Sequence, residues 1–289
     1  MHNIISILNL TYCETRHKIC SKRSVTFLIL LAFLIFVYIS PLKAVSKDAG
    51  YKISPWVFPH LMSHLYFLFT FILGIIYFYS NAPFLNHAGM YQMIRSGRYR
   101  WCISQIISII FSGFTLAAAA LLLSAIILAP RVFLTSEWGK LLHTLSLTDL
   151  GASYNLSFAI SYNLINKLQP IPAMLLAWGV CGLTISFTGI FLFFFSVFIN
   201  RTAAISIIMV LLTGVVIVEN FLPKIQERLY YFLPLAWMQI TRIGETRFGY
   251  GTIPPLHYSI PALCILIILM SVLILIRFKY IELKWNKEE

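Results

Sequence analysis

Six long apolar runs alternate with short polar segments along the chain of 289 residues. The runs fall at about 25–42, 56–80, 102–129, 171–199, 203–222 and 257–278. Each has at least the roughly 17 residues that a helix needs to cross about 30 Å of hydrocarbon. Because backbone groups in lipid must find partners within their own segment, the runs are predicted to be helices rather than strands. The pattern therefore predicts an all-α polytopic membrane protein with six transmembrane helices.

Composition changes this picture mainly by excluding other classes of protein. Hydrophobic residues make up 59% of the chain and charged residues 11%, with a mean hydropathy of +0.83. A soluble domain of this composition would expose too much apolar surface to water. The net charge of +12 would suit a nucleic-acid partner, but the 22 Lys and Arg residues lie in short loops and tails. We therefore expect the positions of the basic residues to reflect orientation in a lipid bilayer, and we expect no nucleic-acid partner.

The distribution of Lys and Arg predicts the orientation of the chain in the membrane. With the N-terminus inside, 12 of the 22 basic residues fall in cytoplasmic segments that total roughly 60 residues, and 10 fall in roughly 90 outer residues. The cytoplasmic set is Arg16, Lys18, Lys22, Arg23, Arg95, Arg98, Arg100, Arg201, Arg277, Lys279, Lys284 and Lys287. This bias favours both termini in the cytoplasm, as an even number of spans requires.

Residues 1–24 form a predicted cytoplasmic amphipathic helix ahead of the six-span domain, which covers residues 25–289. Apolar positions and a basic end in this segment are typical of a helix on a membrane surface. We expect it to lie flat on the inner leaflet and to turn sharply into the first span at about Lys22 to Ser24.

A polar-interrupted segment, LTDLGASYNLSFAISYNLINKL at 147–168, leaves two interpretations open. Tyr154, Phe158, Tyr162 and Ile165 recur at helical spacing, which predicts a helix lying on the outer surface. The alternative is a seventh span, which would place the basic C-terminus outside.

Three common active-site motifs are absent from the sequence. There is no Gly-rich phosphate loop ending in Gly-Lys-Ser/Thr, no HExxH and no G-x-S-x-G. His60 and His64 stand four residues apart, a spacing that places two metal ligands on one helical face. Two ligands make an incomplete site, so packing near the membrane interface is favoured. We expect a chain that is not an enzyme and that holds no cofactor or metal.

One acidic residue, Glu219, lies inside a predicted span, near the outer end of the fifth. A carboxylate in lipid is costly and is often functional. The simpler alternative is that it reaches outer water or pairs with Lys224 or Arg228.

An aromatic, Pro-broken segment at 223–255 follows Glu219. It predicts short helices that dip into the outer interface, either as a lid over the spans or as a merely interfacial loop. The candidate gate or substrate path is Glu219, Tyr230, Tyr231 and Trp237.

A basic, aromatic segment, MYQMIRSGRYRW at 90–101, separates the second and third spans. Ser96 and Gly97 end a short predicted helix there. Its simplest role is that of a positive-inside anchor. The more specific interpretation is a docking knob for a soluble partner, made by Met90, Tyr91, Met93 and Ile94.

This layout resembles the membrane subunit of an ABC-2-type ABC exporter. The likeness rests on the basic inner loop with Arg95, Arg98 and Arg100, the tight turn Asn200-Arg201-Thr202 between spans four and five, and the Pro-broken outer segment at Leu233-Pro234-Leu235. In that family an amphipathic helix leads into six spans. A coupling helix after span two docks in a separate ATPase, and re-entrant outer helices precede span six. Where the family often has acidic residues before the Gly of the coupling segment, this chain has Asn86 and His87 before Gly89.

The resemblance implies an export function that the motifs alone do not give. A separate cytoplasmic ATPase would bind ATP and Mg²⁺, and this chain would dimerise with itself or a paralogue in the bacterial plasma membrane. The ATPase-coupling contact would comprise Met90, Tyr91, Met93, Ile94, Arg95 and Arg98, and residues 84–95 would act as a lever. An amphiphilic substrate would leave outward. A secondary transporter or channel without an ATPase, and a membrane-embedded enzyme, remain the alternatives.

Overall fold

The computed structural model describes residues 2–83, 87–133, 135–148, 150–221, 225–243, 246–247, 250–251 and 253–280. The long helices are α1 (His2–Ile19), α2 (Lys22–Ala49), α4 (Leu65–Tyr79), α5 (His87–Ser96), α6 (Arg98–Leu128), α10 (Pro170–Phe198), α11 (Arg201–Phe221) and α13 (Leu256–Tyr280). The short elements are α3 (Phe58–Met62), α7 (Lys140–Leu147), α8 (Leu150–Ser153), α9 (Tyr162–Lys167), α12 (Gln226–Tyr230), the 3₁₀ helices η1 (Pro234–Met238) and η2 (Ile240–Arg242), and an antiparallel pair of strands, β1 (Thr246–Arg247) and β2 (Tyr250–Gly251).

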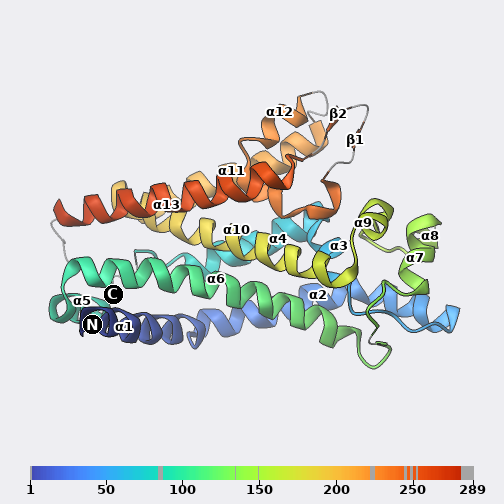
Figure 1. Ribbon diagram of the computed structural model, residues 1–289, viewed down its shortest axis with the longest axis horizontal. Coiled ribbons are helices and arrows are strands. Elements are labelled where there is room, and N and C mark those ends of the chain that lie inside the picture. The colour runs from blue at the N-terminus through green and yellow to red at the C-terminus, as the bar shows by residue number, and fades with distance from the viewer. Residues whose placement is uncertain are drawn as a thin grey trace.

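The fold is an elongated helical bundle, with α10 at its centre (Figure 1). This helix packs most extensively on α6 and also contacts α13, α11 and α4. In its most apolar window 72% of the residues are buried inside the protein, against 22% in α13. A helix that is apolar on all sides is expected at the core of a bundle, with its neighbours facing lipid.

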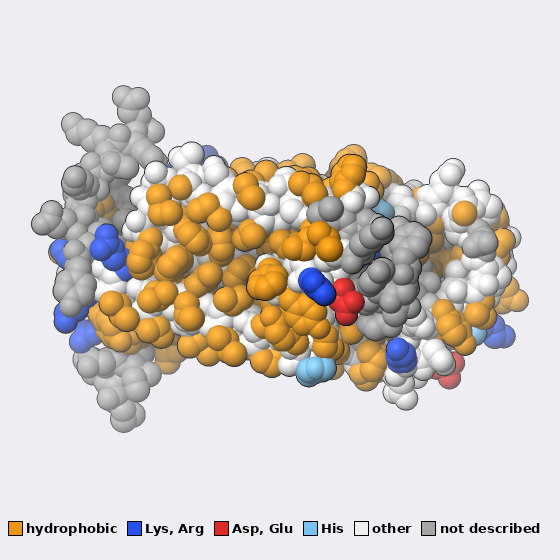
Figure 2. All heavy atoms as spheres, turned by 90° about the horizontal axis from the view of Figure 1, so that it is seen from above, with side chains coloured by type: hydrophobic (Ala, Val, Ile, Leu, Met, Phe, Trp, Pro, Cys, Tyr) orange, Lys and Arg blue, Asp and Glu red, His pale blue; other side chains and the backbone are white. Residues whose placement is uncertain are grey.

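Within the residues that the structure describes, five helices are long and apolar enough to cross a membrane: α2, α6, α10, α11 and α13. The chain is therefore an all-α, multi-pass membrane protein. Figure 2 shows hydrophobic side chains over the middle of one face of the bundle, the surface expected to contact lipid chains.

The second predicted span, 56–80, is not one continuous helix. It is divided into α3 and the 15-residue α4 by a break at Ser63 and His64. The Ser63 hydroxyl donates to the Pro59 carbonyl, and His64 Nδ1 accepts from the backbone N–H of Phe67 at 3.3 Å. These two side chains satisfy backbone groups that the break would otherwise leave without partners.

Contacts between helix ends define one end of the bundle. The Arg23 side chain at the start of α2 donates to the Ser80 hydroxyl beyond α4, and Ser196 near the end of α10 donates to the Ala82 carbonyl. The Arg277 guanidinium near the end of α13 lies 5.8 Å from the Phe198 ring centre. This end also carries α1 and α5, and Lys and Arg side chains gather there in Figure 2. We call it the basic end.

The α1 helix packs against α6 through its polar side. Thr11 and Lys18 are buried there, and the Lys18 amine donates to Gln105 Oε1 at 2.7 Å and to the Ser108 hydroxyl at 3.0 Å. Leu8 and Tyr12 are exposed instead. The chain passes from α1 to α2 at Cys20 and Ser21, slightly before the turn predicted at Lys22 to Ser24. Residues 2–19 thus form a helix, and the side of it that carries Thr11 and Lys18 contacts protein.

The segment 147–168 is neither a seventh span nor one surface helix. Its described residues form the last residue of α7, a four-residue α8 and a six-residue α9. Phe158 is buried, whereas Tyr162 is exposed, so the predicted helical stripe does not form. Asp149 lies outside the described residues.

Small residues allow α6 and α10 to approach closely, as their sequences indicate. A Cβ added at Gly113 would lie 2.4 Å from the Ser186 hydroxyl and 3.1 Å from the Gly182 carbonyl oxygen. A Cβ at Gly179 would have nothing within 4 Å, so that glycine is not needed for the contact.

We predict that Gly113→Ala lowers stability by about 1–3 kcal/mol relative to Gly179→Ala, since only the first overpacks the α6–α10 contact. Both changes alter helix propensity equally, which makes Gly179→Ala the matched control. Thermal unfolding in mild detergent measures the difference. Equal midpoints for the two variants would contradict the close contact at Gly113.

Lys18 generates a second prediction. Burial lowers the pKa of Lys18 from 10.5 to about 7, with Glu14 opposing the shift. Below pH 7 the amine is charged whether α1 is docked or released, and above about 10.5 it is neutral in both. Between these values only the released form is charged, so docking gains stability as the pH rises, by on the order of 1 kcal/mol per pH unit.

The unfolding midpoint of the wild-type chain should accordingly rise between pH 7 and pH 9 relative to that of Lys18→Met. The exposed Lys22 provides the control, since Lys22→Met should keep the wild-type pH profile. Parallel profiles for wild type and Lys18→Met would show that the buried amine does not govern docking.

Candidate functional site

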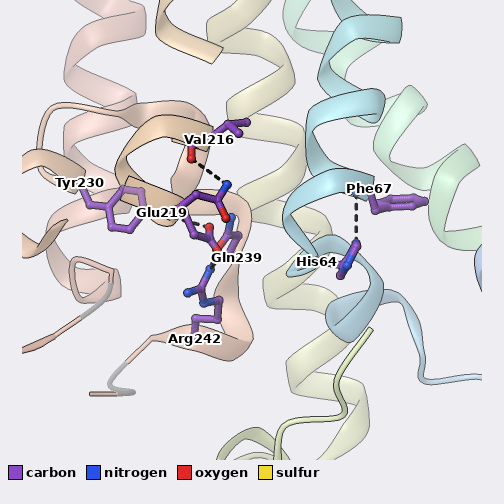
Figure 3. Close-up of polar contacts among 8 residues, drawn as sticks. His64, Phe67, Val216, Glu219, Tyr230, Gln239 and Arg242 are labelled. Atoms are coloured by element: carbon purple, nitrogen blue, oxygen red, sulfur yellow. Dashed lines mark hydrogen bonds and ion pairs between the residues drawn. The ribbon is translucent and has the colours of Figure 1, made fainter. Parts of the chain in front are cut away.

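A polar cluster lies at the opposite end of the bundle, around Glu219 in the last turn of α11. Glu219 Oε1 accepts from Arg242 Nη1 at 2.5 Å, and its Oε2 accepts from the Tyr230 hydroxyl at 3.2 Å. Arg242 Nη1 also donates to Gln239 Oε1 at 2.8 Å. Figure 3 shows Arg242 directed toward Glu219 and Gln239, with Tyr230 on the other side of the carboxylate. We call Glu219, Tyr230, Gln239 and Arg242 the outer cluster.

The outer cluster is positioned by residues 234–242, which carry η1 and η2 and turn back into the bundle. We call them the re-entrant segment. Pro234 fixes the start of η1, whose five residues are all buried against α10, α11 and α13. The next short helix, η2, packs against α3 and ends at Arg242. The buried η1 therefore holds η2 so that Arg242 faces the end of α11.

Aromatic contacts connect the re-entrant segment to α12 and α13. The Trp237 indole N–H donates to the Tyr230 carbonyl oxygen at 2.7 Å. The ring of Tyr258, in the first turn of α13, lies 4.9 Å from that of Tyr231 and 5.7 Å from that of Trp237. All four residues of the predicted gate, Glu219, Tyr230, Tyr231 and Trp237, are thus brought into one region.

The electrostatics of the cluster are those of a largely desolvated ion pair. The Arg242 and Glu219 side chains are only 14% and 11% exposed. Burial, and then the Glu219 charge, raise the pKa of the Tyr230 hydroxyl above its ordinary value. Tyr230 therefore keeps its proton and acts as a hydrogen-bond donor to the carboxylate.

A buried glutamine leaves hydrogen-bond capacity within the cluster. Gln239 must turn its oxygen to Arg242, because a guanidinium only donates, and its Nε2 has no partner. Gln226 lies one helical turn before Tyr230 on α12, and its buried side chain interacts with the Tyr230 hydroxyl. The site is therefore rich in donors, with Glu219 as its charged acceptor.

The predicted partners of Glu219 require a correction. Arg228 is exposed on α12 and makes no ion pair with Glu219, while Lys224 lies outside the described residues. The partner is Arg242, which is 23 residues from Glu219 along the chain. Sequence reasoning also missed Gln226, Gln239 and Tyr258, since only the re-entrant turn brings them close.

The two histidines diverge rather than form one site. His60 is buried, accepts from the backbone N–H of Ser161 at 3.2 Å and packs edge-on against Trp138. His64 caps α4 and packs against Tyr38. Among the described residues, no group of three or more His, Cys, Asp or Glu side chains is placed to hold a metal ion.

At the basic end, α5 is a short helix that lies beside the start of α6 (Figure 1) and is joined to it by Gly97, whose φ of 92° suits glycine. Tyr91 is 68% exposed and Ile94 is 82% exposed. Arg95 and Arg98 are exposed next to them, and Met90 is half-buried. Residues 84–86 of the predicted lever lie outside the described residues.

Met93 differs from the other predicted docking residues. It is 2% exposed, because it belongs to the face of α5 that packs on α6. Met93 therefore attaches α5 to the bundle, and the exposed knob consists of Tyr91, Ile94, Arg95 and Arg98.

Comparison with known proteins identifies no relative: no family model, no curated protein and no solved structure matches this chain.

The ion pair of the outer cluster gives a double-mutant prediction. Arg242→Gln leaves Glu219 largely buried without its counter-charge and should destabilise the chain by about 3 kcal/mol. Glu219→Gln in the same background removes the unpaired charge, so we expect the double variant to recover most of the loss. Denaturant unfolding in detergent of the two single variants and the double variant provides the double-mutant cycle of unfolding free energies.

The exposed Arg228 supplies the control, and Arg228→Gln should change stability by less than about 0.5 kcal/mol. Strictly additive effects of Glu219→Gln and Arg242→Gln would contradict a direct interaction.

Proposed function

We propose that this chain is the transmembrane subunit of an ABC-2-type exporter in a bacterial plasma membrane. It couples ATP hydrolysis by a separate cytoplasmic ATPase to the outward movement of an amphiphilic substrate. The ATPase holds ATP and Mg²⁺, and this chain contributes no catalytic residue. A second copy or a paralogue completes the transport path.

The topology proposed for this function has six crossings, with α3 and α4 together forming the second. Both termini then lie in the cytoplasm, at the basic end. The excess of Lys and Arg at that end supports the assignment, because cytoplasmic loops of membrane proteins are enriched in these residues. The outer cluster and its re-entrant segment form the extracellular gate.

The observation that carries the proposal is the exposed α5 knob at the basic end. Tyr91 and Ile94 are exposed on α5. Because α5 lies at the basic end (Figure 1), the proposed orientation places these apolar side chains in the cytoplasm, beyond the lipid chains. Apolar side chains surrounded by arginines are typical of a protein-binding surface. Met93 fixes α5 to α6, which contacts α10, so a push on α5 reaches the centre of the bundle.

Co-purification tests the proposal. The tagged chain, extracted in mild detergent from its host, should bring down a soluble ATPase in a fixed ratio. Because they remove the exposed contact, the combined changes Tyr91→Ala, Ile94→Ala and Arg95→Glu should reduce recovery by more than about tenfold. Quantitative mass spectrometry of the eluate measures the ratio.

A variant of α1 is the matched control, since Tyr12 is 67% exposed at the same end and Arg16 is exposed beside it. Tyr12→Ala with Arg16→Glu should retain the ATPase. Recovery of the intact chain without any ATPase would contradict the exporter proposal and favour transport without ATP hydrolysis.

A further inference from the structure

We infer that the outer cluster is a binding site for the anionic headgroup of an amphiphile, and that Glu219 occupies the place of that anion in the present structure. The inference rests on the proposed export function and names its substrate class: an amphiphile whose head carries a phosphate or carboxylate.

The donors of the cluster exceed what Glu219 uses. Arg242 and the Tyr230 hydroxyl donate to the carboxylate, while the Nε2 group of Gln239 is buried and without a partner. Buried donors are ordinarily paired, so an unpartnered one beside a guanidinium indicates a place for further acceptor atoms. Phosphate and carboxylate groups provide several acceptor oxygens, and their geometry matches the guanidinium fork.

The position of the cluster along α11 agrees with the depth at which a lipid headgroup lies in a membrane. Glu219 lies 18 residues beyond Arg201, the first residue of α11. At 1.5 Å per residue this is about 27 Å along the helix, close to the thickness of the hydrocarbon core. In the proposed orientation, the cluster lies at the level of the headgroups of the outer leaflet.

Glu219 then acts as an internal substitute for the anionic headgroup. A guanidinium that is only 14% exposed is costly to leave without a counter-charge. The carboxylate supplies that charge while the site holds no substrate, and an incoming anion takes its place. Release of Glu219 frees the end of α11 from η2, so headgroup binding and opening of the re-entrant segment become one event.

If a bound anion replaces Glu219 at Arg242, substitutions of Glu219 and of Arg242 should change the affinity for the anion in opposite directions. Glu219→Gln removes the internal competitor and should raise affinity for an anionic amphiphile several-fold. Arg242→Gln removes the cationic donor and should lower it by about tenfold. A purely structural ion pair predicts that both changes act in the same direction.

Lipid binding to the purified chain provides the test. Short-chain phosphatidylglycerol is titrated against the detergent-solubilised chain, with short-chain phosphatidylcholine as the zwitterionic control, and native mass spectrometry counts the bound molecules. The wild-type chain should prefer phosphatidylglycerol, Glu219→Gln should strengthen the preference and Arg242→Gln should abolish it. The neighbouring exposed pair gives the controls, Glu227→Gln and Arg228→Gln, which should retain wild-type binding.

The double variant Glu219→Gln/Arg242→Gln covers the case in which Arg242→Gln alone fails to fold. It lacks both charges and should bind the two lipids equally. A retained preference in the double variant, or equal losses in Glu219→Gln and Arg242→Gln, would overturn the inference. A titration with inorganic phosphate distinguishes a site for a free anion from a site for a lipid headgroup. Equal affinity for phosphate and phosphatidylglycerol would overturn the amphiphile assignment.

The assay needs no ATPase, so its failure is distinguishable from failure of the proposed function. A chain that co-purifies with an ATPase but shows no headgroup preference would retain the exporter proposal and lose this site. A preference for phosphatidylglycerol in a chain that brings down no ATPase would retain this site and contradict the exporter proposal.

Discussion

Backbone polar groups inside a membrane protein must be satisfied by the protein itself, and this requirement shapes the end of the bundle that carries the outer cluster. Two irregular segments lie there, the break between α3 and α4 and the re-entrant η1–η2 segment. They meet at one residue: the backbone N–H of Thr241 donates to the Ser63 hydroxyl at the break, and the Ser161 hydroxyl donates to the Thr241 carbonyl oxygen. Because Thr241 directly precedes Arg242, these contacts help to fix the position of Arg242 and so of the outer cluster.

The hydrophobic pattern predicted much of the bundle because lipid exposure imposes long apolar runs with little ambiguity. The predicted starts of spans three to six lie within four residues of α6, α10, α11 and α13. The break at Ser63 was missed although its signal is present, since a Ser-His pair interrupts an otherwise apolar run and both side chains bond to nearby backbone. Periodicity also could not show that the polar side of α1 would face Ser104 and Gln105 of α6.

The candidate site was recovered in part, for a physical reason. Glu219 stands out in sequence because a carboxylate within an apolar run is expensive. Its partner does not, because Arg242 belongs to a loop and the pairing depends on how the re-entrant segment folds. The docking knob at α5 was predicted from Met90, Tyr91, Met93 and Ile94, yet sequence alone did not separate Met93, which packs inward, from Ile94, which is exposed.

Both proposals depend on which end of the bundle faces the cytoplasm, so the most direct measurement is the sidedness of the two ends. In a background with Cys13 and Cys20 replaced by Ser, single cysteines at the exposed positions Ile94 and Leu150 report the basic end and the opposite end. A membrane-impermeant maleimide applied to intact cells should label Leu150→Cys at once and Ile94→Cys only after permeabilisation. Labelling of Ile94→Cys in intact cells would place the α5 knob outside, beyond the reach of a cytoplasmic ATPase, and would contradict the account.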